Sequence, residues 1–230
     1  MSHGRLCIVP LLGDFVRRYP NIVVDIDLSD AIIDVAAGQA DVAVRGGPLS
    51  DSALTARRLS ENGRTIVASP DYLARWGVPE IPEDLHNHNC LNFSFRRAEP
   101  VWPFRRDGVD FALKVRGAIE ANSGETLGQL ALDGVGIARV GNFSLGDAIA
   151  QRRLVPLLEP FNPGDKEIFQ AVFVGGANMP ARVRVFVDYL VECMGGSRGP
   201  RRSTPHRRRR TRQTRAAILL EPVRASDRFN

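Results

Sequence analysis

The chain has 230 residues and a mass of 25.3 kDa, with 43% hydrophobic and 25% charged residues. This is enough for one ordinary domain or two small lobes, and the apolar content excludes a chain that is disordered throughout. No stretch approaches the roughly 18 consecutive apolar residues of a membrane-spanning helix, and the first residues lack the pattern of a secretory signal. We therefore expect a cytoplasmic protein with no membrane partner.

The net charge of +5 is unevenly distributed. Residues 195–230 contain eleven arginines and two acidic residues, a net charge of +9, so residues 1–194 carry −4. Because the basic charge belongs to this tail, the high isoelectric point is no evidence that the rest of the chain binds nucleic acid.

The first part of the chain predicts helices alternating with strands. Apolar residues at helical spacing predict a helix between Pro10 and Pro20, and a period of two over residues 22–28 predicts a strand. Ser29 is a candidate cap for a following helix, and residues 41–45 are typical of a second strand.

The alternation continues through residue 194. Further strands are predicted at 64–68, 109–115, 136–140, 154–158 and 168–174, and further helices at 70–76, 124–132, near 145–150 and from 180 to 194. Ser69 is a candidate cap for the helix at 70–76, and Ser123 or Asn122 for the helix at 124–132. Strands alternating with helices predict an α/β fold, and the number of elements suits two lobes better than one.

Several motifs follow one another in an order typical of one family. They are Leu11-Leu-Gly-Asp-Phe-Val-Arg-Arg-Tyr-Pro20, Asp41-Val-Ala-Val-Arg-Gly-Gly-Pro48, Val67-Ala-Ser-Pro-Asp-Tyr-Leu73, Pro82-Glu-Asp-Leu-His-Asn-His-Asn-Cys-Leu91, Gly134-Val-Gly-Ile-Ala138, Arg153-Leu-Val-Pro156 and Val185-Phe-Val-Asp-Tyr-Leu-Val191. In this order they resemble the effector-binding domain of LysR-type transcriptional regulators. The resemblance covers residues 1–194 and depends on the succession of motifs rather than on any single one.

The resemblance implies a two-lobe α/β fold of the type 2 periplasmic-binding-protein class, with two crossover strands and a small-molecule effector in the cleft. Lobe I is expected over residues 1–65 and 170–194, and lobe II over residues 66–169. Two lobes joined by a hinge suit a switch, because a ligand that binds one arrangement better shifts the population toward it.

Two departures from the family pattern are visible. The winged helix-turn-helix and the linker helix of such regulators are not found in these residues, so DNA would be reached only through a domain that this chain lacks. The chain also begins in the loop after the expected first strand of lobe I, which predicts a sheet with a missing strand and an exposed edge. These departures fit a fragment, a mis-assigned start or a decayed gene. The alternatives to the sensor part of a complete regulator are a stand-alone small-molecule binding protein and a non-functional gene fragment.

Candidate effector-binding residues lie near helix starts, where backbone N–H groups, the helix dipole and small hydroxyl groups favour anions, and at one strand end, where an arginine could add charge. The helix-start candidates are Ser2, Ser29, Asn122, Ser123 and Gly124, and the strand-end candidate is Arg45. Helix capping alone also explains Ser29 and Ser123, and Arg45 also fits a solvated or lobe-bridging residue. A carboxylate or an aromatic acid is the ligand class that the family implies.

Other motifs carry no catalytic or cofactor assignment. The segment His86-Asn-His-Asn-Cys90 lacks the spacing and the second ligand cluster of a zinc site. Gly134-Val-Gly136 lacks the third glycine of a dinucleotide fingerprint and is interpreted as a helix-to-strand turn. Gly195-Gly-Ser-Arg-Gly199 matches a nucleophile-elbow string in the wrong context, because a helix precedes it and an arginine-rich stretch follows. We predict no enzyme activity, no metal and no cofactor.

The tail, residues 195–230, is predicted to be disordered, since its arginines lie among Gly, Ser, Thr and Pro. It could bind phosphates weakly, DNA included, or be a non-homologous extension whose deletion leaves the folding of the rest unaltered. The family resemblance also implies a homodimer or homo-oligomer.

Overall fold

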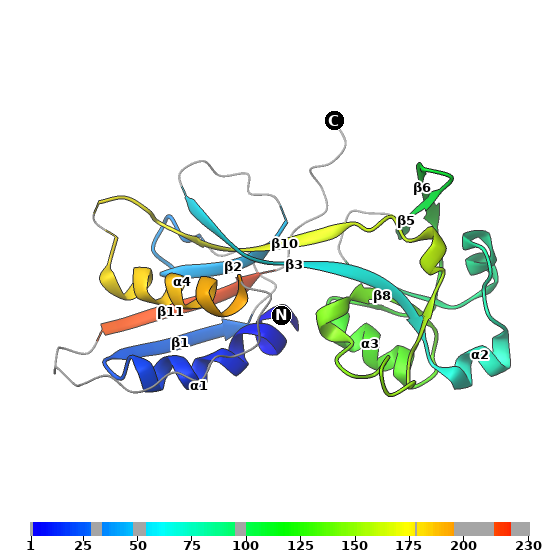
Figure 1. Cartoon of the computed structure of the whole chain (residues 1–230), viewed down its shortest axis with the longest axis horizontal. Coiled ribbons are helices and arrows are strands. Elements are labelled where there is room, and N and C mark those ends of the chain that lie inside the picture. The colour runs from blue at the N-terminus through cyan, green and yellow to red at the C-terminus, as the bar shows by residue number, and fades with distance from the viewer. Residues whose placement is uncertain are drawn as a thin grey trace. The chain divides into compact units, whose positions relative to one another are not determined.

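The computed structural model describes residues 2–28, 34–47, 54–94, 100–177, 179–195 and 214–221 (Figure 1). These residues divide into two compact units, one built from His3–Glu61 and the chain from Glu167 to the end of the last strand, the other from Asn62–Lys166 together with Ser2. Two strands, β3 (Thr55–Ala68) and β10 (Lys166–Phe173), run from one unit into the other.

The first unit is a sheet with two helices. Its elements are η1 (Gly4–Ile8), α1 (Val9–Arg18), β1 (Ile22–Leu28), β2 (Val42–Gly46), the first part of β3, most of β10, α4 (Ala181–Met194) and β11 (Thr214–Glu221). The two helices pack together through Phe15 of α1, whose ring lies 4.9 Å from that of Phe186 and 5.1 Å from that of Tyr189 on α4. Tyr189 also donates a 2.8 Å hydrogen bond to the carbonyl oxygen of Leu11. These contacts form the core of the unit, as the apolar spacing of both helices predicts.

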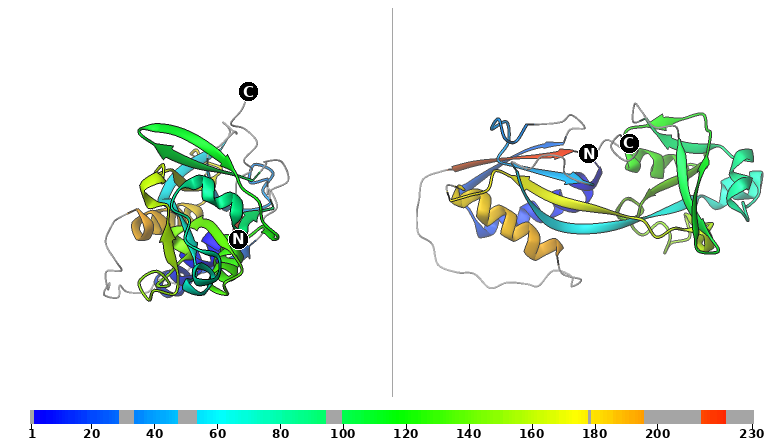
Figure 2. Two further views of the ribbon diagram at one scale, coloured as in Figure 1. Left: turned by 90° about the vertical axis from the view of Figure 1, so that its right-hand side faces the viewer. Right: turned by 90° about the horizontal axis from the view of Figure 1, so that it is seen from above.

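Strand β11 is the main difference from the sequence prediction. It lies between β1 and β2 and is parallel to both, as Figure 1 and the right-hand view of Figure 2 show. Thr214–Glu221 thus forms a strand of this sheet, although the sequence analysis includes these residues in a disordered tail. The arginine-rich composition of residues 195–230 hides a short apolar run, Ala216-Ala-Ile-Leu-Leu220.

The second unit has its own sheet, in the order β3-β8-β4-β7 with β9 paired to β3, and a separate hairpin of β5 and β6. The elements are α2 (Pro70–Trp76), η2 (Pro82–Asn87), β4 (Cys90–Phe93), β5 (Val101–Arg106), β6 (Val109–Lys114), β7 (Glu120–Ala121), α3 (Gly124–Leu132), β8 (Ile137–Gly141), η3 (Asn142–Ser144), β9 (Val155–Leu157) and η4 (Glu159–Phe161). Apolar residues form two buried clusters in this unit, one around Tyr72 and Phe104 and one around Leu127 and Val140.

The predicted helix near 145–150 is wrong. Residues 145–150 form turns, because Gly146 has φ of +51°, a left-handed conformation that interrupts a right-handed helix. The sequence prediction also missed β4, β5 and the first nine residues of β3. Ser69 caps α2 as predicted, since the amide of Tyr72 donates a 3.3 Å hydrogen bond to its Oγ. In the described part of the chain, no helix is long and apolar enough to cross a membrane.

Candidate functional site

The N-terminus of α3 brings together two of the predicted site residues. Ser123 is the N-cap, with extended backbone, and its Oγ accepts a 3.4 Å hydrogen bond from the amide of Thr126. The Oγ of Ser2 lies 3.0 Å from the Oγ of Ser123 and accepts a 3.3 Å hydrogen bond from the amide of Glu125. Two hydroxyl groups therefore satisfy two of the first amides of α3, groups that the helix itself leaves without a partner.

The electrostatics of this arrangement favour an anion. The amide groups and the positive end of the helix dipole point toward the two hydroxyls, and each hydroxyl can also donate a hydrogen bond to a ligand oxygen. Ser2 is buried and Ser123 is half-buried, so a ligand carboxylate would reach the amides by replacing a serine hydroxyl or by accepting from it. This is chemistry for binding, and it includes no nucleophile activated by a neighbouring base.

The two residues that flank Ser123 differ in their surroundings. Asn122 is exposed, directly before the cap. A Cβ atom on Gly124 would lie 3.3 Å from the ring of Phe93, tighter than most such contacts, so a side chain at position 124 would require this ring to shift. Glycine therefore keeps the first turn of α3 narrow on the side of β4.

Arg45 belongs to the first unit. It is half-buried on β2, and its Cα pairs in register with Gln170 on β10 and with Glu221 on β11. Gln170 donates a 2.9 Å hydrogen bond from Nε2 to the carbonyl oxygen of Gly47, which closes the turn after β2. Ser29, the remaining predicted site residue, lies outside the described residues.

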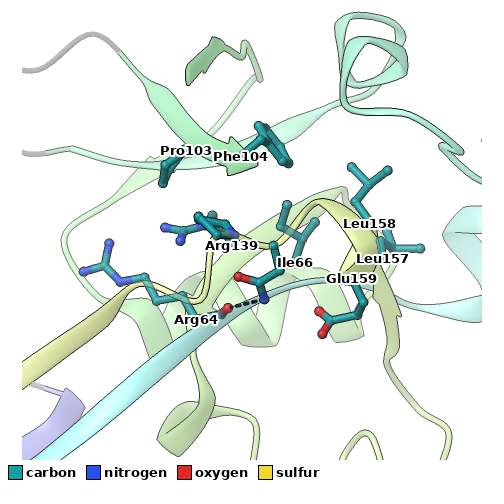
Figure 3. A pocket seen from close by; sticks show the side chains of 10 residues that line it. Arg64, Ile66, Pro103, Phe104, Arg139, Leu157, Leu158 and Glu159 are labelled. Carbon is teal, nitrogen blue, oxygen red and sulfur yellow. Dashed lines mark hydrogen bonds between the residues drawn. The ribbon is translucent and has the colours of Figure 1, made fainter. Parts of the chain in front are cut away.

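A pocket in the second unit was missed by the sequence reasoning. It is small, with a cavity volume of about 10 Å³, and its main lining residues are Arg64, Ile66, Phe104, Arg139 and Leu157, drawn in Figure 3. Asn162 spans part of the wall by donating a 3.2 Å hydrogen bond to the carbonyl oxygen of Arg64. The available signal was Arg139, a charged residue inside the otherwise apolar strand Ile137-Ala-Arg-Val140.

Arg139 is buried, with 6% of its surface exposed, and it forms an ion pair with Asp165. Burial lowers the pKa of Arg139, while the hydrogen bond to Asp165 acts in the opposite direction. The carboxylate of Asp165 is the partner that makes a buried guanidinium tolerable.

The histidine- and cysteine-containing segment has structural contacts. His88 Nδ1 lies 3.3 Å from the hydroxyl of Tyr72, and the Cys90 thiol lies 3.6 Å from the carbonyl oxygen of Leu85. Burial raises the pKa of Cys90 to about 12, so this thiol is a poor nucleophile and a poor metal ligand at neutral pH. Across the described ranges, no group of three or more histidine, cysteine, aspartate or glutamate side chains is arranged to hold a metal ion.

Comparison with known families gives a match over most of the chain. The family "LysR substrate binding domain" matches residues 1–195. Among curated proteins, the HTH-type transcriptional regulator CrgA of Neisseria meningitidis serogroup C is 35% identical over 190 residues, and DmlR of Escherichia coli is 33% identical over 190 residues. These alignments cover 83% and 81% of this chain but only 63% and 61% of the two relatives. The chain thus spans less than two thirds of the length of either regulator.

Solved structures give the same result for the fold. The regulatory domain of CrgA from Neisseria meningitidis has a TM-score of 0.77 at 34% identity, with 85% of this chain and 95% of that domain covered. Full-length CrgA matches with a TM-score of 0.78, and 66% of that chain is covered. The predicted fold class is confirmed by these neighbours, and the matched relatives are regulators rather than enzymes, as predicted.

Proposed function

Because the chain belongs to the LysR substrate-binding domain family, we propose that it senses a small-molecule effector and thereby regulates transcription. The effector class is a carboxylate or an aromatic acid. The proposed contacts are Ser2, Asn122, Ser123 and Gly124 at the start of α3, with Ser29 and Arg45 as further ligand contacts from the first part of the chain.

One observation carries the choice of site. Ser2 and Ser123 are 121 residues apart in sequence, yet their Oγ atoms lie 3.0 Å apart at a helix N-terminus. A cap needs only one of them, since Ser123 Oγ already accepts from the amide of Thr126. The second hydroxyl, from Ser2, makes the site a pair of groups that can donate to one carboxylate while the helix dipole favours its charge.

The experiment compares two capping serines of the same unit. Ser123→Ala and Ser69→Ala each remove a cap hydrogen bond, from Thr126 and from Tyr72 respectively, so each lowers the free energy of unfolding by about 1 kcal/mol. Binding of benzoate and of succinate, as an aromatic acid and an aliphatic dicarboxylate, is measured by titration calorimetry for the unmodified protein and both variants. Whichever acid binds the unmodified protein identifies the class.

The expected result is at least about a tenfold weaker affinity for Ser123→Ala, the loss of about one charge-assisted hydrogen bond, and an unchanged affinity for Ser69→Ala. Equal affinities in all three proteins would remove Ser123 from the site. Weakening by both variants to the same extent would show that stability, rather than contact with the ligand, governs the affinity.

Partners and location follow from the regulator role. We propose that the domain pairs with a second copy and that it works in the cytoplasm. The relatives are named HTH-type regulators, and full-length CrgA extends beyond the matched region. DNA recognition is therefore assigned to a helix-turn-helix domain outside residues 1–195, with the arginines of the tail as a weaker, salt-sensitive contact.

A further inference from the structure

Strands β1 and β2 are neighbours in the chain but not in the sheet. The Cα atoms of Ile22–Leu28 pair with those of Thr214–Leu220, and the Cα atoms of Val42–Arg45 pair with those of Ile218–Glu221. Within the described part of the chain, β1 is the end of the strand order and β11 is its neighbour there. Removing β11 would leave the backbone N–H and C=O groups of two facing strand edges without ladder partners.

The slot between β1 and β2 is an interior position. Val42, Ala43 and Val44 are all buried, and β2 is paired on its other side with β10. The sheet is mixed at this point, because β2 is antiparallel to β10 and parallel to β11. Since β2 is buried, a strand that pairs with it in this slot is expected to be short and apolar.

The tail contains one segment with this character. Ala216-Ala-Ile-Leu-Leu220 is an uninterrupted apolar run within residues 195–230, where eleven arginines otherwise dominate. Its length matches a buried strand of a parallel sheet, which is usually a continuous apolar run of four to eight residues.

The chain can bring this segment to the slot by itself. Eighteen residues separate Gly195, where α4 ends, from Thr214, where β11 begins. Fully extended, such a connection reaches about 60 Å. A domain of about 100 residues has a radius of gyration of only about 13 Å, so the connection is long enough to cross the whole unit.

We propose that Thr214–Glu221 is a strand-complementing segment, supplied by this chain to its own first unit, and that the slot between β1 and β2 is the surface that recognises it. Residues 196–213 connect α4 to this segment along the sequence and are called the tether below. On this proposal the strand-complementing segment is not a dispensable extension, because it pairs with both β1 and β2.

Hydrogen exchange on the whole chain tests the proposal. In the unmodified protein, the amides of residues 216–220 are expected to exchange at least about tenfold more slowly than those of an unstructured peptide of the same sequence. Exchange of these amides at the rate of the free peptide would overturn the proposal without the need for any variant.

Two proline variants of the full chain extend the test. Ala217→Pro with Ile218→Pro removes two consecutive amides from β11, whereas Thr204→Pro changes the tether alone. The double variant is expected to accelerate exchange in residues 22–28 and 42–46 at least about tenfold, while β4 and β8 of the second unit keep their protection. Unchanged protection of β1 and β2 in the double variant, or an equal loss in Thr204→Pro, would contradict the proposal.

Engineered disulfides establish whether the strand in the slot comes from the same chain or from a second copy. Val24 and Ala216 are register partners, so Val24→Cys with Ala216→Cys is expected to form a disulfide within one chain, in a background with Cys7 and Cys193 replaced by alanine. Val24→Cys with Leu219→Cys, three residues out of register, is the control. A disulfide between two chains would show that a second copy supplies the strand, and cross-linking no higher than the control would exclude the register; either result overturns the proposal.

Discussion

Ser2 Oγ and Ser123 Oγ lie 3.0 Å apart, although 121 residues separate them in the sequence. Each hydroxyl also accepts a hydrogen bond from an amide in the first turn of α3, from Glu125 and Thr126 respectively. The two serines therefore form one hydrogen-bonded pair, and substitution of either one changes the hydrogen bonding of the other.

A double-mutant cycle on this pair is expected to be non-additive. Ser2→Ala and Ser123→Ala each lower the free energy of unfolding by about 1 kcal/mol, since each removes hydrogen bonds from partly buried groups. The double variant should lose less than the sum by about 0.5–1 kcal/mol, because the bond between the hydroxyls can be lost only once. Denaturant titration measures all four proteins, and strict additivity would show that the two hydroxyls do not interact.

His3 is expected to make stability depend on pH. Its ring stacks on Phe169 at 3.6 Å, and burial lowers its pKa from 6.5 to about 4. Between these values the unfolded chain binds the proton and the folded chain does not, so stability is full above pH 6.5 and is lost as pH falls toward 4. The loss between pH 7 and pH 5 is on the order of 2 kcal/mol.

The variant His3→Phe keeps a ring against Phe169 and removes the titration. Its free energy of unfolding should fall less between pH 7 and pH 5 than that of the unmodified protein. If His3→Phe retained the full slope, other groups would be responsible for it.

Arg139 and Asp165 predict an asymmetry between two substitutions. Asp165→Ala leaves a buried guanidinium without its carboxylate and is expected to cost about 1–2 kcal/mol, a figure reduced because Asp165 is 43% exposed. Arg139→Met removes the buried charge as well and should cost less. The exposed pair Arg105 and Asp110 is the control, where Asp110→Ala should leave the free energy of unfolding essentially unchanged, because solvent screens this ion pair. A larger loss for Arg139→Met than for Asp165→Ala would show that the guanidinium itself stabilises the fold.

Two glycines are expected to respond to alanine in opposite directions. A Cβ on Gly136 would collide with the carbonyl oxygen of Asn89, so Gly136→Ala should lower the melting temperature by several degrees, about 1–3 kcal/mol. In α1 the nearest atom to a Cβ on Gly13 is 3.7 Å away, on the side chain of Arg17. Gly13→Ala should therefore leave stability unchanged or raise it by about 0.5–1 kcal/mol. Thermal unfolding of the two variants distinguishes the effects.

Local signals in the sequence predicted local structure well. The sequence predicts Ser69 as one cap and Ser123 or Asn122 as another, because a short polar side chain before a helical apolar pattern can accept from the first amides of the helix. Ser69 and Ser123 accept the expected amides. A period of two in the sequence predicts strand β1. In the structure Ile22, Val24, Ile26 and Leu28 pack against the core, while the residues between them are exposed. In these cases the period of the pattern and the direction of burial agree.

The failures have a common physical origin in distant partners. The first part of β3 shows no alternation, because Leu59 is its one buried residue and the others are exposed or half-buried. Its strand geometry depends on neighbours elsewhere in the chain. The geometry of β11 likewise depends on distant partners, because it pairs with β1 and β2, which lie at residues 22–28 and 42–46. Ser2 and Ser123 were both named as candidates, but no local pattern predicts that their hydroxyls meet.

The position of β11 also sets an order of events during synthesis. At translation rates of about 5–20 residues per second, the segment that separates β1 from β2 emerges roughly ten to thirty seconds after they do. The second unit, in contrast, is built almost entirely from one continuous stretch, Asn62–Lys166. The half of the molecule that is begun first is thus completed last, and until then a nascent chain presents two open strand edges to chaperones and to its neighbours on the polysome.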